Sequence, residues 1–251
     1  MSLRLPRPPW IVGHRGAAGE APENTLASLA LALEQGADMI EIDVQLTADG
    51  GLVVFHDESL ERLAGSDLRT ESVDRAALAA LRVGSFGGQA IGIPGLGEAI
   101  AALPADCPLN IELKRQSAAT ARLAAGLVEQ VEGRCQVLVS SFDWPLLEEV
   151  RRLGPTLPLA LLIDDLNAPD AASSLVAAAD RLEAWSIHVS AKAAEAALRG
   201  LASGPRPVIC YTVNDAIRAQ ELFSWGVSGV FTDFPGRLRL ALGLSPGPQF
   251  H

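Results

Sequence analysis

The strongest constraint on the fold of this chain is a series of short apolar runs separated by helical stretches. Runs that predict β-strands cover residues 10–16, 39–46, 109–114, 136–142, 159–163, 184–190, 208–214 and 229–234, and helical windows cover 25–36, 119–133, 144–154 and 215–226. Strands that alternate with helices favour a parallel sheet with both faces covered. Eight such units in 251 residues predict an α/β fold, a (β/α)₈ TIM barrel, with a doubly wound open sheet as the second choice.

One interval between predicted strands is much longer than the others, and it lies between the second and third strands. We expect it to hold an insertion at about residues 47–95. The insertion begins with Asp49-Gly50-Gly51, a turn signal between two extended runs, so we expect a hairpin that returns His56 to the barrel. The rest should close over the mouth and help to select the substrate's alcohol group. No linker or repeat divides the chain, so residues 1–251 are expected to form a single domain.

Composition excludes several classes of partner. The net charge is −10 and no Lys/Arg cluster stands out, so nucleic acid is not an expected partner. No apolar run approaches the length of a membrane span, and the first ten residues lack the apolar stretch of a secretory signal. We therefore expect no stable membrane insertion and a cytoplasmic location. The widely spaced Cys107, Cys135 and Cys210 fit reduced, buried thiols.

Three carboxylates occur on the polar faces of two neighbouring predicted strands. Side chains alternate along a strand, so Glu41 and Asp43 share one face of residues 39–46, and Glu112 lies on the polar face of residues 109–114. In a barrel the apolar faces pack on helices, so these carboxylates should point inward at the C-terminal mouth. A hard divalent cation, Mg²⁺ or Ca²⁺, would offset their repulsion. The alternative is a salt-bridged layer with Arg15 and Lys114.

Histidines form the second constellation. His14 and His56 each follow an extended apolar run, and both should lie near the same mouth, where imidazoles can serve as general acid and general base. Asp57 should not orient His56, because neighbours on a strand face opposite ways; it could instead form a turn. His188 is a candidate to line the substrate pocket, or else a buried hydrogen-bonded histidine.

Two cations accompany these groups. Arg15 could bind a phosphate through its planar fork, and Lys114 as a point charge. Asn24-Thr25 has the pattern of a helix N-cap. Glu23 could simply favour the N-terminal end of the helix dipole.

These residues belong to a set of motifs that resembles the glycerophosphodiester phosphodiesterase family, most closely its compact bacterial cytosolic members. The resemblance extends from Ile11 to Pro235, and nine motifs in order make it specific. They are His14-Arg15-Gly16, Pro22-Glu23-Asn24-Thr25, Glu41-Ile42-Asp43-Val44, Thr47-Ala48-Asp49-Gly50, Val53-Val54-Phe55-His56-Asp57, Ile111-Glu112-Leu113-Lys114, Ser141-Phe142, Tyr211-Thr212-Val213-Asn214 and Gly229-Val230-Phe231-Thr232-Asp233.

The resemblance implies a TIM barrel that hydrolyses small glycerophosphodiesters to an alcohol and sn-glycerol 3-phosphate. It implies that one divalent cation is held by Glu41, Asp43 and Glu112, with Glu23 as a further candidate ligand. His14 and His56 become the acid–base pair. Arg15 and Lys114 become phosphate contacts, and together with Phe142, Tyr211 and the candidate His188 they are the expected substrate-binding residues. Many relatives have Trp where this chain has Tyr211, so the alcohol side of the pocket differs from theirs.

Other interpretations stay open at this point. A related barrel phospholipase D or lyase acting on lysolipids would need an apolar rim, and no obvious one is present. A non-catalytic barrel that binds phosphorylated ligands would be favoured by loss of a histidine or carboxylate, and all are present. The residues do not decide which histidine is the acid, nor whether water or a glycerol hydroxyl is the nucleophile.

Overall fold

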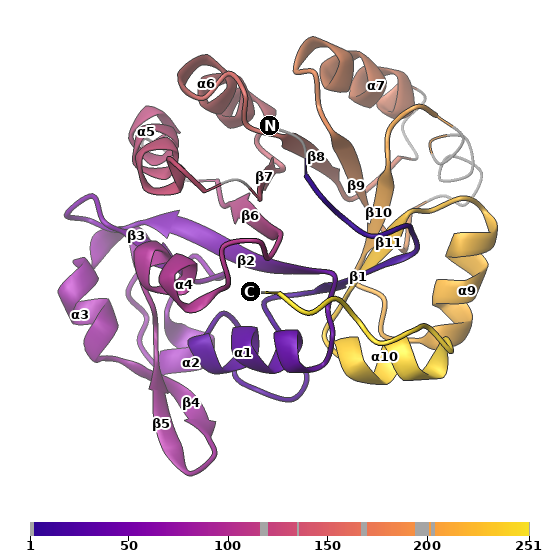
Figure 1. Cartoon of the computed structure of the whole chain (residues 1–251). Coiled ribbons are helices and arrows are strands. Elements are labelled where there is room, and N and C mark those ends of the chain that lie inside the picture. Colours follow the sequence, from indigo (N-terminus) through magenta and orange to yellow (C-terminus); the bar gives the residue numbers. More distant parts are fainter. Residues whose placement is uncertain are drawn as a thin grey trace.

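A ring of parallel strands surrounded by helices forms the body of the molecule (Figure 1). The structure is a computed structural model that describes residues 3–115, 120–134, 136–166, 170–193, 201 and 204–250. Within these ranges, eight parallel strands pair in a closed circle because β1 joins β2 as well as β11. They are β1 (Trp10–Gly13), β2 (Met39–Leu46), β6 (Leu109–Leu113), β7 (Val137–Ser141), β8 (Leu159–Ile163), β9 (Ser186–Ser190), β10 (Val208–Tyr211) and β11 (Gly229–Thr232). The predicted TIM barrel is confirmed.

Helices follow the barrel strands and cover the outside of the ring. They are α1 (Leu26–Glu34), α4 (Leu96–Ala102), α5 (Thr120–Val131), α6 (Trp144–Leu153), α7 (Ala171–Arg181), α9 (Ala216–Ser224) and α10 (Pro235–Ala241). The first begins after Thr25, whose hydroxyl accepts a hydrogen bond from the Ser28 N–H in a capping box, worth about 1 kcal/mol. It ends before Gly36, which adopts a positive φ of 75°. The N-cap prediction for Thr25 is therefore confirmed.

Two hydrophobic cores result from the alternation of side chains along the strands. Outward residues such as Ile40, Ile42 and Ile111 pack against the helices in the larger core. The smaller core fills the barrel interior and consists of inward residues, among them Trp10, Val12 and Phe231. Polar residues above this smaller core are thereby left at the C-terminal mouth of the barrel, where TIM-barrel sites lie.

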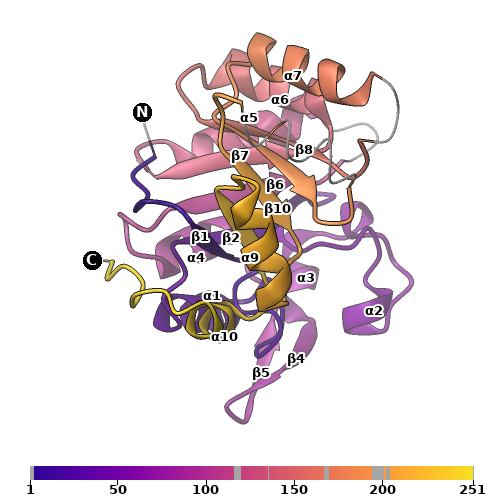
Figure 2. The same cartoon turned by 90° about the vertical axis from the view of Figure 1, so that its right-hand side faces the viewer.

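The segment between β2 and α4 begins with the expected hairpin. Here β3 (Leu52–Val54) pairs antiparallel with β2. The remainder contains α2 (Glu61–Ala64), the 3₁₀ turn η1 (Thr70–Ser72), α3 (Arg75–Ala80) and a second hairpin of β4 (Arg82–Phe86) and β5 (Gln89–Gly92). A small core of Val53, Phe55, Leu60, Leu78 and Ile93 holds it together. Figure 2 shows α2 on the side away from both termini, while the β4–β5 hairpin projects outward.

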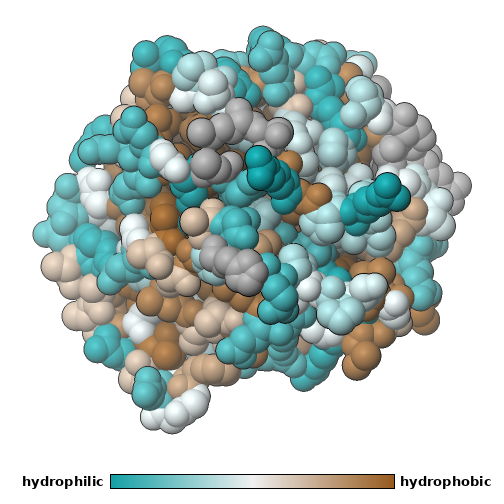
Figure 3. All heavy atoms as spheres, viewed as in Figure 1, coloured by the Kyte–Doolittle hydropathy of each residue, from teal (hydrophilic) through white to brown (hydrophobic). Residues whose placement is uncertain are grey.

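The surface seen in Figure 3 is mixed in hydropathy. On the face seen in Figure 3, hydrophilic residues are interspersed with hydrophobic patches. Among the described residues, no helix combines the length and apolarity needed to cross a membrane. Cys107 and Cys210 are buried free thiols, and burial raises the pKa of each to about 12. Cys135 lies outside the described residues.

Candidate active site

Glu41, Asp43 and Glu112 converge at the mouth of the barrel. The register of β2 and β6 places Asp43 beside Glu112, one strand apart. One ligand atom from each of the three carboxylates lies within 4.8 Å of the others. Glu41 and Asp43 are buried, and one oxygen of Glu41, Oε1, has no hydrogen-bond partner among the described residues. An all-oxygen set with an unpartnered buried carboxylate oxygen fits a hard divalent cation such as Mg²⁺ or Ca²⁺.

The electrostatics of these carboxylates show how unfavourable it is to ionise all three without further positive charge. Burial and the nearby Asp43 raise the pKa of Glu41 to about 8. The same two causes raise the pKa of Glu112. Burial also opposes ionisation of Asp43, but Lys114 and Arg15 lie close enough to hold its pKa below the ordinary value. A bound cation would stabilise the ionised forms of all three groups.

Arg15 and Lys114 lie directly beside the carboxylates. The Lys114 Nζ is 3.1 Å from the Asp43 Oδ1 and 2.5 Å from the Glu112 Oε1. The Arg15 Nε is 3.1 Å from the Asp43 Oδ2, and its backbone N–H donates to the Glu41 Oε2 at 2.8 Å. The salt-bridged layer considered as an alternative is thus present, and it is made by the same residues that could hold a cation. Both basic side chains line the cavity and can reach an anion there.

His14 and His56 line the same cavity, and each is held by a carboxylate. The Nδ1 of His14 is 2.7 Å from the Asp233 Oδ1, and the Nδ1 of His56 is 2.7 Å from the Asp57 Oδ1. A carboxylate at Nδ1 favours a proton on that nitrogen and leaves Nε2 as the working atom. Both imidazoles are therefore prepared to exchange a proton through Nε2.

The two imidazoles differ in their surroundings. Burial opposes the charged form of His14, but the hydrogen bond to Asp233 and the charge of Glu41 outweigh it, so the pKa of His14 is raised. Burial dominates at His56 and lowers its pKa, although Asp43 acts in the opposite direction. Pairs of groups whose pKa values are pushed apart are typical of acid–base sites.

The expectation that Asp57 would not orient His56 is wrong. The strand β3 ends at Val54, so His56 and Asp57 lie in irregular backbone where alternation of side chains does not apply. The Gln45 side chain fixes this loop by donating to the carbonyls of Phe55 and Asp57, each at 2.8 Å. The loop geometry turns the two side chains toward each other.

Three site residues were missed or underrated by sequence reasoning. Asp233 lies in a recognised motif but had no assigned role, and Asn214 donates to its second oxygen at 2.6 Å. Asn24 donates to the Asp43 Oδ2 at 2.8 Å, whereas the N-cap role belongs to Thr25. Arg62, six residues after His56 on α2, carries no sequence signal of its own. Two of the three lie in motifs of the resemblance, Asp233 in Gly229-Val230-Phe231-Thr232-Asp233 and Asn24 in Pro22-Glu23-Asn24-Thr25, whereas the contacts of Arg62 depend on tertiary structure alone.

Two non-glycine residues of the candidate active site have a left-handed backbone conformation. Arg15 and Asn24 have positive φ angles of 53° and 56°. Non-glycine residues in the left-handed region are uncommon and tend to cluster at functional sites. Both residues place a side chain against Asp43, so the strained backbone is used to gather groups around that carboxylate.

Glu23 is engaged elsewhere and does not join the carboxylate cluster. Its Oε1 accepts from the Arg15 Nη1 at 2.8 Å, and both of its oxygens accept from Arg62. Burial opposes ionisation, but these hydrogen bonds and charges lower the pKa of Glu23. Its role in the described structure is to hold Arg15 rather than to complete the cation site.

The cavity at the mouth measures about 260 Å³ and has an aromatic side. Phe142 and Tyr211 lie on this side, with ring centroids 5.9 Å apart in an edge-on arrangement. The Tyr211 hydroxyl donates to the Ile163 carbonyl at 2.8 Å. Of residues 47–95, which are all described, only His56 lines the cavity, and the expectation that the insertion closes over the mouth and helps to select the alcohol group stays a prediction.

His188 lies deeper, in the barrel interior. It is fully buried, its Nε2 is 3.0 Å from the Ser186 Oγ, and its ring packs on Phe231 at 4.9 Å between centroids. Burial lowers the pKa of His188 to about 3, so the imidazole stays neutral. It is not among the residues that line the cavity. The structure therefore favours the buried hydrogen-bonded histidine over the substrate contact.

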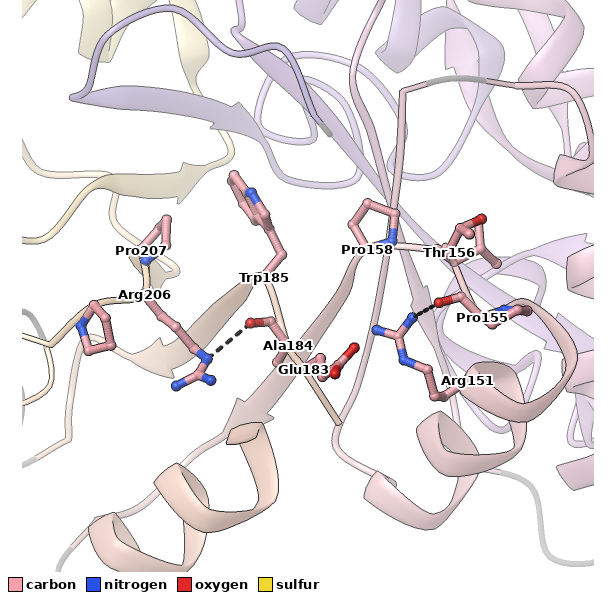
Figure 4. Close-up of a pocket in the computed structure, with 11 residues that line it drawn as sticks. Arg151, Pro155, Thr156, Pro158, Glu183, Ala184, Trp185, Arg206 and Pro207 are labelled. Carbon is pink, nitrogen blue, oxygen red and sulfur yellow. Dashed lines mark hydrogen bonds between the residues drawn. The ribbon is translucent and has the colours of Figure 1, made fainter. Parts of the chain in front are cut away.

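A larger cavity of about 600 Å³ lies at the opposite end of the barrel, before strands β8, β9 and β10 (Figure 4). Its arginines are occupied by backbone carbonyls: Arg151 donates to Pro155 at 2.6 Å and Arg206 donates to Ala184 at 3.0 Å. Trp185 stacks on Trp10 in the floor of the barrel. This cavity is larger, but the smaller one at the mouth is the candidate active site, because the carboxylates and the two histidines lie there.

Comparison with known proteins agrees with this geometry. The model of the glycerophosphoryl diester phosphodiesterase family matches residues 14–237, a range that includes every residue of the candidate active site. The chain belongs to this family. A glycerophosphodiester phosphodiesterase of Bacillus altitudinis is 33% identical to this phosphodiesterase over 90% of this chain and 95% of its own. One of Bacillus subtilis is 31% identical over 89% of this chain and 83% of its own.

Solved structures show the same relationship. An Oleispira antarctica phosphodiesterase in complex with the product sn-glycerol-3-phosphate has a TM-score of 0.85 and 31% identity to this phosphodiesterase, covering 94% of this chain and 97% of that one. The likeness therefore extends over nearly the whole chain.

Proposed function

We propose that this phosphodiesterase hydrolyses glycerophosphodiesters to an alcohol and sn-glycerol 3-phosphate with the help of one divalent cation. The observation that supports it most strongly is the meeting of three carboxylates, two basic side chains and two carboxylate-held histidines around one cavity. Family membership adds that relatives of similar length carry this activity in their names.

Glu41, Asp43 and Glu112 would hold the cation, either Mg²⁺ or Ca²⁺. A divalent cation bound there supplies Lewis-acid charge to a phosphoryl oxygen. The unpartnered Oε1 of Glu41 is the protein atom of this cluster most in need of such a partner. Lys114 and Arg15 stabilise the negative charge that develops on the phosphoryl group, and they do so from opposite sides of Asp43.

His14 and His56 divide the proton transfers. One imidazole removes the proton of the nucleophile, and the other protonates the departing alcohol, each through Nε2 because Asp233 and Asp57 occupy the Nδ1 atoms. The attacking group is either water or the glycerol hydroxyl of the substrate. Phe142 and Tyr211 contact the organic part of the substrate on the aromatic side of the cavity.

The product distinguishes this reaction from its alternatives. Purified protein is incubated with glycerophosphocholine, glycerophosphoethanolamine or lysophosphatidylcholine, and the products are followed by ³¹P NMR. We expect sn-glycerol 3-phosphate from the first two substrates. Conversion of lysophosphatidylcholine alone, to lysophosphatidic acid, would favour a phospholipase D. A cyclic phosphate that persists would favour a lyase, and no turnover of any diester would favour a binding protein.

A further inference from the structure

Arg62, on the short helix α2 of the insertion, connects two carboxylates that contact residues of the active site. Its Nε donates to the Asp57 Oδ2 at 2.6 Å. Its two terminal nitrogens donate to the two oxygens of Glu23, at 2.8 and 2.7 Å. The guanidinium thus uses both of its edges, one for each carboxylate, which is a geometry that only arginine can provide.

Each of these carboxylates also holds a residue of the active site. The other oxygen of Asp57 is 2.7 Å from the His56 Nδ1. The Oε1 of Glu23 accepts from the Arg15 Nη1 at 2.8 Å. Arg62 itself does not line the cavity. Arg62 is therefore linked to the His56 imidazole through Asp57 and to the Arg15 guanidinium through Glu23.

We propose that Arg62 is a positioning residue that fixes the His56 imidazole and the Arg15 guanidinium relative to each other. This inference rests on the proposed function, because it assigns Arg62 to the acid–base and phosphate-binding groups of that reaction. It also assigns a role to the insertion, since Arg62 is carried by α2.

The contacts of Arg62 differ from ordinary surface ion pairs. Exposed pairs contribute little because two long side chains must be held in one geometry. The Arg62 side chain is 48% exposed, but it is held at three points, and its partner Glu23 is only 16% exposed. Hydrogen bonds to Glu23 and Asp57 raise the pKa of Arg62, and those from Arg62 help to lower the pKa of both carboxylates.

Arg69 provides a matched control within the insertion. Its side chain is 53% exposed and it pairs with Glu58 and Glu71, so it resembles Arg62 in exposure and in number of carboxylate partners. Neither of these two glutamates lines the cavity. Arg62→Gln and Arg69→Gln therefore remove the same kind of side chain from the same segment, and only the first breaks the link to His56 and Arg15.

Steady-state kinetics with glycerophosphocholine tests the proposal. A slight misplacement of a catalytic group can cost up to about 10²-fold in rate, so we expect kcat to fall about 10- to 100-fold in Arg62→Gln with a smaller change in KM. Arg62→Lys keeps the charge without the fork and should give an intermediate kcat. Arg69→Gln should match the wild type. Asp57→Asn combined with Arg62→Gln should cost less than the product of the single effects, because both act through His56.

A measurement independent of turnover separates this inference from the proposed function. The chain has four histidines, so ¹⁵N NMR of the imidazoles can follow His56. Asp43, Lys114 and Arg15, whose charges also act on His56, are kept in the variant. We expect the protonated Nδ1 signal of His56 to shift in Arg62→Gln and to stay in place in Arg69→Gln. Unchanged kinetics and unchanged His56 signals in Arg62→Gln, or full kcat in Arg62→Lys, would overturn the proposal. If the wild type hydrolyses no diester, the proposed function fails, and the NMR signals still decide whether Arg62 positions His56.

Discussion

Replacing His14 or His56 should impair catalysis without impairing metal binding. Removing either imidazole should lower kcat by about 10²–10⁴-fold, the usual contribution of general acid–base catalysis. Metal affinity should stay near the wild-type value in His14→Ala and His56→Ala, because the cation would be held by the carboxylates. Isothermal titration with Mg²⁺ or Ca²⁺ and steady-state assays measure the two properties separately.

A leaving group that needs no proton identifies the general acid. With a glycerol p-nitrophenyl phosphodiester, the variant that lacks the acid should recover much of its rate, and the variant that lacks the base should not. Equal rates for both variants on this substrate would contradict the division of roles. Loss of metal binding in either histidine variant would contradict it as well.

Glu41 should behave in the opposite way. Glu41→Gln removes a negative charge and an expected ligand, so the Mg²⁺ or Ca²⁺ concentration needed for half-maximal activity should rise, and added metal should restore part of kcat. Glu98→Gln, at an exposed position outside the cavity, is the control. An unchanged metal requirement in Glu41→Gln would remove this residue from the cation site.

His188 predicts a pH dependence of stability. Its pKa is about 3 in the folded protein and about 6.5 when exposed, so only the unfolded state binds a proton between these values. The free energy of unfolding should therefore fall by about 2 kcal/mol, through His188 alone, when the pH falls from 6.5 to 5. Urea unfolding at several pH values should show that the free energy of unfolding falls less steeply with decreasing pH in His188→Gln than in the wild type. Parallel curves would mean that the imidazole is not held neutral.

Sequence patterns predicted the elements of the barrel well and those of the insertion poorly. Each barrel strand is a short apolar run buried on both faces, and the predicted ranges overlap all eight observed strands of the described residues. The β4–β5 hairpin is exposed and contains several glycines, and α2 spans a single turn, so neither leaves a periodic signal. Similarly, His14 and Asp233 are far apart in the sequence, and no local pattern predicts that they are hydrogen-bonded.

The structure of the insertion predicts that its two parts contribute differently to the enzyme. Residues 84–90 form the exposed end of the β4–β5 hairpin and do not line the cavity. Replacing them with a short turn should leave headgroup preference and unfolding temperature nearly unchanged. A changed preference among glycerophosphodiesters would show that this hairpin contacts the substrate.

Leu78 on α3 is the opposite case. It is fully buried in the small core with Phe55, whose backbone precedes His56. Leu78→Ala should cost about 2–5 kcal/mol through lost burial and the cavity that remains. Thermal unfolding measures this loss, and a change below about 0.5 kcal/mol would contradict the role of that core in holding the loop of His56.

At the scale of the whole molecule, the question is how an acidic protein handles an anionic substrate. The net charge of −10 gives no general attraction for a phosphodiester. Positive charge is instead concentrated at the mouth of the barrel, where Arg15 and Lys114 meet the carboxylates. Their two charges do not balance three carboxylates and a phosphodiester, so turnover should require a divalent cation.

The most direct test of the proposed cation site is therefore whether product release depends on a divalent metal. The protein is dialysed against EDTA, the chelator is removed, and release of sn-glycerol 3-phosphate from glycerophosphoethanolamine is followed with a coupled dehydrogenase assay. We predict no release without added metal and restored release when Mg²⁺ or Ca²⁺ is added. Full activity in the metal-free protein, unchanged by either cation, would contradict the proposed cation site.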